Sequence, residues 1–225
     1  MVRDKALTRE KLIAATRDKL LADGLESINV DNVCKLAGFT RGAFYSNFKK
    51  IDELILLMVE QELSHYINRF QAMTNQWVAA VDKLTPDFEE KDPVAQLATL
   101  LLNTKVAGGL DRSFFVLYYE VETKSLRVPE WAEMIVPLLL QFVESVADIL
   151  VAMLEHVGRR PTVRKQLLGQ AVIGLVARSK GLNTWNSYIT ELVQQHPELA
   201  DAVLTDEEIS HINATLMIAF SEPNN

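Results

Sequence analysis

The chain has 225 residues, of which 48% are hydrophobic and 24% charged, so it has enough apolar side chains for a packed core. This composition excludes a disordered chain, and no run approaches the roughly 18 apolar residues of a membrane span. A single cysteine, Cys34, excludes an internal disulfide, and the charged start MVRDKALTREK contains no apolar signal region. We therefore expect a soluble, cytoplasmic, globular protein with no membrane partner.

The net charge of −7 is distributed unevenly along the chain. Residues 1–53 hold 10 Lys and Arg against 8 Asp and Glu, a balance of +2. Residues 54–225 hold 13 against 22, a balance of −9. A basic segment on an acidic body is compatible with phosphate binding, because salt keeps electrostatic attraction local. An ordinary solvated surface would carry similar charges, so charge alone does not decide the function.

Helical spacing of apolar residues recurs along almost the whole chain, and no segment alternates convincingly as a strand would. The first helix is predicted over 8–23, with Thr8 as its amino-terminal cap and Gly24 as its stop. Asn29 is suited to cap a second helix over 30–37. The amino-terminal segment is therefore predicted to form short helices with well-marked ends.

A third helix, predicted over 41–47, is too short to be stable alone and must be held by packing. Phe39, Phe44 and Phe48 are its expected anchors. The residues expected to face outward with DNA-binding chemistry are Thr40, Arg41, Gly42, Ala43, Tyr45 and Asn47. Arg41 can reach base edges, polar neighbours suit phosphate oxygens, and small residues allow close approach to a groove. This arrangement predicts a helix-turn-helix, although three small helices inside a larger bundle would have similar spacing.

Three stretches carry a family resemblance, namely TREKLIAATRDKLLADG, VDNVCKLAGFTRGAFYSNF and DELILLMVE. With them, the segment from Thr8 to about Glu60 resembles the TetR (tetracycline-repressor) family of bacterial transcription regulators. The run AGFTRGAFYSNF is quite specific, because its Ala-Gly, Gly-Ala-Phe-Tyr and final Phe occur together at the family's spacing. Family members usually have a backbone-contacting His and Lys where this chain has Asn47 and Ile51.

The resemblance implies a DNA-reading unit in this segment. Ile51 cannot donate to a phosphate, so Lys49 or Lys50 is expected to take that role. The full set of predicted DNA contacts is Asn29, Thr40, Arg41, Gly42, Ala43, Tyr45, Asn47, Lys49 and Lys50.

A long amphipathic helix predicted over 52–84 would connect the DNA-reading unit to the rest of the chain. Further helices are predicted over 93–106, from Asp111 onward, and over 130–156. Pro137 lies inside the last of these, so we expect a kink or a break near Val136.

Aromatic residues concentrate in these middle helices and could line an effector cavity. The predicted ligand-binding residues are Phe70, Trp77, Phe114, Phe115, Tyr118, Tyr119, Glu122, Trp131 and Phe142. Taken one by one, the rings fit packing in an ordinary core better, whereas as a set they fit a cavity. The effectors of the family that this chain resembles occupy such a cavity, so the resemblance implies a small, mostly apolar or aromatic ligand.

The last helices are predicted over 162–179 and 206–220, the second opened by a capping box of Thr205 and Glu208. They match the place where the family builds a four-helix dimer interface, and Gly169, Ala171 and Gly174 would permit close approach. Packing within one subunit is the alternative. We expect the terminal SEPNN to be frayed.

Other chemistry finds little support in the sequence. The four histidines have no metal-ligand spacing, and we expect Cys34 to pack as a small apolar side chain. No phosphate loop, nucleophile elbow or pair of catalytic carboxylates occurs, so we predict no cofactor, no metal and no enzyme activity.

The sequence predicts an all-α chain with a helix-turn-helix domain over 1–53 and a helical effector-binding and dimerisation domain over 54–225. Its expected function is a ligand-responsive regulator, most simply a repressor, that binds a palindromic operator as a homodimer. The alternatives are an activator, a helical protein-interaction module, or an enzyme that uses the aromatic cavity.

Overall fold

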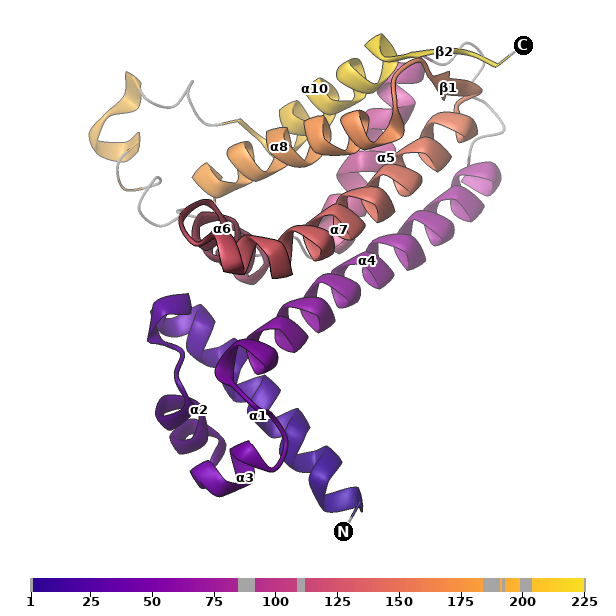
Figure 1. The fold of residues 1–225 in the computed structure, drawn as a ribbon. Helices are drawn as coiled ribbons and strands as arrows, with labels where there is room; N and C mark the ends of the chain where they lie inside the picture. Colours follow the sequence, from indigo (N-terminus) through magenta and orange to yellow (C-terminus); the bar gives the residue numbers. More distant parts are fainter. Residues whose placement is uncertain are drawn as a thin grey trace. The chain divides into compact units, whose positions relative to one another are not determined.

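The computed structural model describes residues 2–84, 92–108, 112–183, 191, 193–198 and 204–224. The described residues form helices joined by short turns, with one small two-stranded sheet (Figure 1). This architecture confirms the prediction of an all-α chain.

The helices begin and end close to the predicted positions. They are α1 (Val2–Asp23), the short 3-10 helix η1 (Leu25–Ser27), α2 (Val30–Ala37), α3 (Arg41–Tyr45), α4 (Ile51–Leu84), α5 (Pro93–Gly108), α6 (Arg112–Arg127), α7 (Pro129–His156), α8 (Lys165–Asn183) and α10 (Asp206–Ala219). Several bounds differ from the prediction. The helix α1 begins before Thr8, so Thr8 is not its amino-terminal cap, and α3 ends at Tyr45 rather than at residue 47. The helix α8 runs over Lys165–Asn183 rather than over 162–179.

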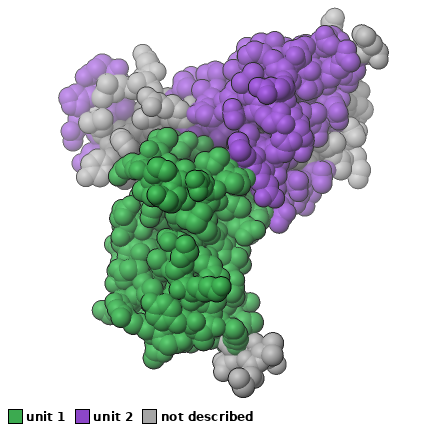
Figure 2. All heavy atoms as spheres, in the orientation of Figure 1, with its two compact units in different colours: residues 1–65, 112–139 green, residues 66–111, 140–225 purple. Residues whose placement is uncertain are grey.

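Contacts between residues divide the chain into two compact units (Figure 2). Unit 1 contains residues 1–65 and 112–139, and unit 2 contains residues 66–111 and 140–225. By this division, residues 54–65 and the helix α6 belong to the same compact unit as the amino-terminal helices. The predicted boundary after residue 53 concerned function, which a division by contacts does not test, and it stays a prediction.

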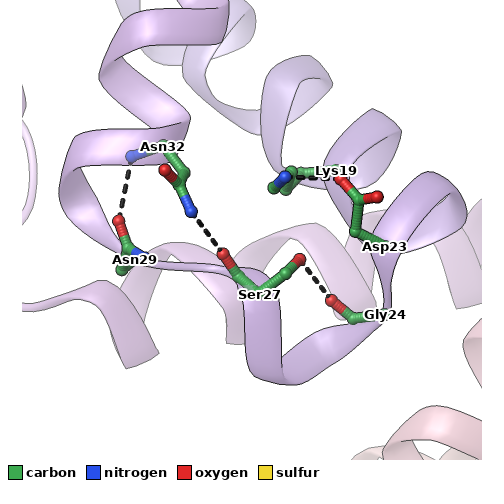
Figure 3. A network of polar contacts seen from close by, with 6 residues as sticks. All are labelled: Lys19, Asp23, Gly24, Ser27, Asn29 and Asn32. Carbon is green, nitrogen blue, oxygen red and sulfur yellow. Dashed lines mark hydrogen bonds and ion pairs between the residues drawn. The ribbon is translucent and has the colours of Figure 1, made fainter.

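In unit 1, local hydrogen bonds fix the start of α2 (Figure 3). The Asn29 side chain accepts from the Asn32 N–H at 2.9 Å, and the Asn32 amide donates to the Ser27 carbonyl at 2.9 Å. Gly38 ends the helix with a φ of +73°, a left-handed conformation that glycine adopts without steric cost. The predicted cap at Asn29 and the predicted bounds of the helix over 30–37 are thus confirmed.

The helices α1 and α3 and the start of α4 contribute buried apolar side chains to the core of unit 1. Its fully buried side chains include Leu12, Leu20, Phe44, Phe48, Leu54 and Met58. Thr16 is also fully buried, and its hydroxyl donates to the Leu12 carbonyl at 2.8 Å. This bond explains how a polar residue is tolerated at a core position of α1.

In unit 2, α10 packs along α5, and α8 lies beside α10 (Figure 1). The helix α8 also approaches α7 closely, because a Cβ atom at Gly169 would lie 3.0 Å from Ala147 Cβ and 3.1 Å from the Val143 carbonyl oxygen. Lys165 joins the same two helices through ion pairs with Glu144, at 2.6 Å, and with Asp148. Gly169 therefore serves packing within the chain, whereas the prediction assigned it to a dimer interface.

The expectation that the carboxyl terminus is frayed is wrong. The strand β2 (Ser221–Pro223) pairs antiparallel with β1 (Arg159–Pro161), and Arg160 lies opposite Glu222. Arg159 fixes this pairing, because its guanidinium donates to both the hydroxyl and the carbonyl oxygen of Ser221 at 2.8 Å. These contacts join residues about sixty positions apart, which a local reading of SEPNN could not reveal.

The helix α7 runs from Pro129 to His156 with Pro137 inside it, so the helix does not break near Val136, and the alternative of a kink there stays a prediction. Buried side chains at Trp131, Ile135 and Phe142 on both sides of Pro137 explain how the helix continues despite the lost hydrogen bond. By length and composition α7 could also cross a membrane, and it is the one described helix that meets this test. Core helices of globular proteins meet it too, so it is weak support for a membrane partner.

Candidate nucleic-acid interface

The short helix α3 is anchored by two rings and leaves its opposite side exposed. Phe44 and Phe48 are 0% and 1% exposed, with ring centroids 5.7 Å apart, whereas Tyr45 is 59% exposed. Arg41, Gly42 and Ser46 are exposed as well. A five-residue helix has few hydrogen bonds of its own, so these buried rings hold it in place. The chain therefore presents a polar helical face that its own core does not require.

Thr40 caps the amino-terminal end of α3. Thr40 Oγ1 accepts from the Ala43 N–H at 3.2 Å, which fixes the first turn. A Cβ atom added at Gly42 would approach only Thr40 Oγ1, at 3.7 Å, among the described atoms within 4 Å. The fold would accept a larger residue there, which supports the prediction that Gly42 allows an external surface to approach.

Asn47 is placed differently from the expectation of an outward phosphate donor. Its side-chain Nδ2 donates to the Ala43 carbonyl at 2.8 Å and to Ser46 Oγ at 3.2 Å. Its Oδ1 is buried and has no hydrogen-bond partner among the described residues. The amide hydrogens thus close the carboxyl-terminal end of α3, and a phosphate contact by Asn47 stays a prediction.

Basic residues flank the exposed face of α3. Lys49 and Lys50 are exposed, and the Lys49 backbone N–H donates to Glu53 Oε2 at 2.9 Å. Arg9 of α1 lies over the Phe48 ring, with Cζ 4.6 Å from the centroid, and donates to the Asn47 carbonyl at 3.4 Å. Sequence reasoning placed Arg9 in a basic segment but did not place it at the end of α3, because that contact depends on the packing of α1.

Arg41 forms an ion pair that the sequence did not predict. Its Nε donates to Asp31 Oδ1 and its Nη2 donates to Asp31 Oδ2. The Arg41 guanidinium lowers the pKa of Asp31, and both side chains are exposed, at 66% and 59%. Cys34 lies nearby in α2, where burial raises the pKa of its thiol, as expected for an unreactive, packed cysteine.

In unit 1, four of the predicted aromatic residues contact one another along α6, namely Phe114, Phe115, Tyr118 and Tyr119. The Phe114 and Phe115 rings are 5.2 Å apart, and Phe114 stacks on Tyr118 at 5.9 Å. Both phenylalanines are buried, whereas Tyr119 is 37% exposed. The rings therefore pack against one another, as the core-packing alternative requires, and a ligand role for them stays a prediction.

Two polar groups accompany these rings. Tyr118 Oη donates to Glu122 Oε1 at 3.4 Å, and burial beside that carboxylate raises the pKa of Tyr118 to about 12. The buried Trp131 donates from Nε1 to the Val121 carbonyl at 3.4 Å. These contacts show how the polar atoms of the large rings are satisfied on burial.

The other three predicted ligand residues belong to unit 2. Phe142 is buried, and the side chains of Phe70 and Trp77 lie outside the described ones. A groove of about 570 Å³ does occur in unit 2, between α5 and the start of α10. It is lined by Ala95, Ala98, Thr99, Leu102, Leu204, Glu207, Glu208, Ser210, His211 and Ile212, so none of the nine predicted ligand residues contributes to it.

A hydrogen bond ties α6 to the amino-terminal helices of unit 1. Glu120 Oε2 accepts from the Leu25 backbone N–H at 2.9 Å, at the start of η1. Glu120 Oε1 also lies 3.2 Å from the position that a Cβ atom would occupy at Gly24. The helix that carries the aromatic cluster therefore contacts the segment that leads into α2. This contact joins residues far apart in sequence, so the sequence did not predict it.

Comparisons with known proteins support the fold. No protein-family model and no curated sequence matches the chain. Among solved structures, a Mesorhizobium loti protein described as a TetR-family transcriptional regulator has a TM-score of 0.62 and 14% identity, over 96% of this chain and 98% of that one. Salmonella enterica GusR has a TM-score of 0.61 and 14% identity, over 95% and 94% of the two chains.

One solved neighbour holds a ligand that its name states. The transcriptional regulator FadR from Bacillus subtilis, in complex with stearoyl-CoA, has a TM-score of 0.58 and 15% identity, over 93% of this chain and 97% of that one. At these identities the likeness concerns the fold, and it confirms that this chain has the fold of TetR-family regulators.

Proposed function

We propose that this protein is a DNA-binding transcriptional regulator of the TetR type, acting in the cytoplasm as a homodimer on a palindromic operator. The observation that carries the proposal is the exposed face of α3, where Arg41, Gly42 and Tyr45 point outward while Phe44 and Phe48 anchor the helix. A helix held this way, after a turn that contains glycine, has the form that enters a major groove. The shared fold supports the same function.

A small-molecule effector is the second part of the proposal. FadR holds stearoyl-CoA in a similar fold, which supports an apolar or aromatic ligand in the helical body of this chain. The contact between Glu120 and the Leu25 N–H supplies a physical link from α6 to the segment before α2. A ligand that displaced α6 would act on the DNA-reading helices through this link, and a coupling of roughly 1–3 kcal/mol would suffice for release.

The proposal is tested first by selecting binding sites from random double-stranded DNA and measuring affinity at several salt concentrations. We expect a palindromic site, with affinity that falls steeply as salt rises because phosphate contacts release counterions. The variant Arg41→Ala/Tyr45→Ala should stay folded, since both side chains are exposed, and should lose operator binding. Arg127→Ala removes an exposed arginine from α6 and should bind as the wild type does.

Failure of the wild-type protein to select any DNA would overturn the proposal. Full function of the folded double variant would instead favour a helical module that docks a protein groove. Candidate effectors are then added to the operator complex, and release without chemical change of the ligand is the expected result.

A further inference from the structure

The face that is proposed to meet DNA carries an acidic residue, Asp31, in contact with Arg41. Asp31 lies in the first turn of α2, is exposed, and holds the Arg41 guanidinium of α3 through both carboxylate oxygens. A carboxylate near phosphates weakens binding by repulsion, so its presence there needs a compensating role.

Among the described residues, the ion pair with Asp31 occupies one edge of the Arg41 guanidinium and no hydrogen bond occupies the other. A guanidinium has five N–H groups, and Asp31 engages the side edge, one hydrogen from Nε and one from Nη2. The outer edge, with one hydrogen on Nη1 and one on Nη2, remains directed away from Asp31. Two parallel donors of this kind match the O6 and N7 acceptors that guanine presents in the major groove.

The contact also restricts where that edge can point. Arginine has a long flexible side chain, and fixing it in one geometry on the protein before binding lowers the entropy cost of the base contact. We propose that Asp31 is a positioning residue that orients Arg41 to read a guanine in each half-site of the operator. The inference rests on the proposed function and deepens it, since it names guanine as the base that is read and Asp31 as the residue that enforces this preference.

Sequence selection with the wild-type protein gives the first readout, a guanine at one fixed position of each half-site. Fluorescence anisotropy then compares the selected operator with one in which that G·C pair is replaced by A·T. For the wild type we expect a preference on the order of tenfold to a hundredfold for the guanine operator.

The variant Asp31→Asn separates positioning from charge. Losing a negative charge near phosphates should leave non-specific DNA binding unchanged or tighter, while the preference for guanine falls to about threefold or less. Asp18→Asn removes the same charge from an exposed position on α1 and should keep the full preference. Arg41→Lys cannot form the fork, so adding Asp31→Asn to it should change the preference no further.

The outcomes distinguish this inference from the function on which it rests. If the wild type selects no DNA, the proposed function fails, and the inference fails with it. A selected operator without a fixed guanine, or an Asp31→Asn variant that keeps the full preference, overturns the inference alone. Tighter operator binding by that variant with unchanged preference would show that Asp31 only opposes DNA. Circular dichroism of each variant checks that the fold is intact.

Discussion

Gly42 is a residue whose small size the described part of the chain does not require. A Cβ atom there would make only an ordinary contact with Thr40 Oγ1, at 3.7 Å. We predict that Gly42→Leu keeps the thermal midpoint within a few degrees, because leucine is the better helix former by up to about 1 kcal/mol. The added side chain should hold α3 away from a groove floor and weaken operator affinity by about tenfold or more.

The matched control for this change is Ala14→Leu, which places the same side chain at an exposed position of α1. Anisotropy titrations and thermal melts of both variants supply the comparison. Wild-type operator affinity in Gly42→Leu would show that α3 does not enter the groove closely.

Also at the residue scale, the limit of sequence reasoning lies in contacts between distant residues. The cap at Asn29 was predicted correctly, because it depends on a side chain and an N–H three residues later. The cap predicted at Thr8 was wrong, since α1 begins at Val2. The pair of Asp31 with Arg41 could not be predicted, since it depends on the angle between α2 and α3. Asn47 was assigned to phosphate by analogy, whereas its amide donates within α3.

At the scale of elements, Glu120 joins α6 to η1 through the Leu25 N–H at 2.9 Å. We predict that Glu120→Ala lowers the free energy of unfolding by about 1–3 kcal/mol, because a partly buried N–H loses a charged acceptor. Glu120→Gln retains one acceptor oxygen, so its free energy of unfolding should lie between those of Glu120→Ala and the wild type. Chemical denaturation gives the free energies, and hydrogen exchange at the Leu25 amide, expected to accelerate, locates the effect.

The control for this link is Glu122→Ala, two residues further along α6, whose carboxylate accepts from Tyr118 instead. It should leave exchange at the Leu25 amide unchanged. Equal protection of that amide in Glu120→Ala and in the wild type would contradict the proposed link between α6 and the DNA-reading helices.

Most helices could be predicted to within a few residues, since periodicity, caps and glycine stops are local signals, whereas α1 begins at Val2 and not at Thr8. Local signals also explain the capping box of Thr205 and Glu208, which the structure confirms. The strand β2 was missed because Ser221 is ordered by Arg159, far away in sequence. Of the kink or break predicted near Val136, the break does not occur, since tertiary packing overrides the local preference of Pro137.

At the scale of the whole molecule, the proposed homodimer requires an apolar face that the single chain does not use. Gly174 of α8 has no described atom within 4 Å of an added Cβ, whereas Gly169 on the same helix packs against α7. Leu167 and Ile212 are 47% and 39% exposed on α8 and α10, in line with a face left for a partner. Substitutions at Gly174 and at Gly169 therefore test the proposed interface and the subunit core separately.

We predict that Gly174→Glu gives a folded monomer, because the fold has room for the side chain while a two-fold interface would bring two carboxylates together. Gly169→Glu should instead destabilise the subunit by about 1–3 kcal/mol or more, since Ala147 must move and a charge is buried. Sedimentation velocity measures the association state, and thermal melts measure the fold. A Gly174→Glu variant that remains dimeric would place the interface elsewhere.

The consequence for DNA binding follows from linkage between the two half-sites. In a dimer the second recognition helix meets its half-site at an effective concentration in the millimolar range, which typically strengthens binding by about 10²–10⁴-fold. The monomeric Gly174→Glu variant keeps α3 intact, so it should bind an isolated half-site as well as the wild-type subunit does. Its affinity for the full palindrome should fall nearly to that half-site value. Equal affinity of the variant and the wild type for the palindrome, with the variant shown to be monomeric, would mean that one copy of α3 suffices and that dimerisation does not set operator recognition.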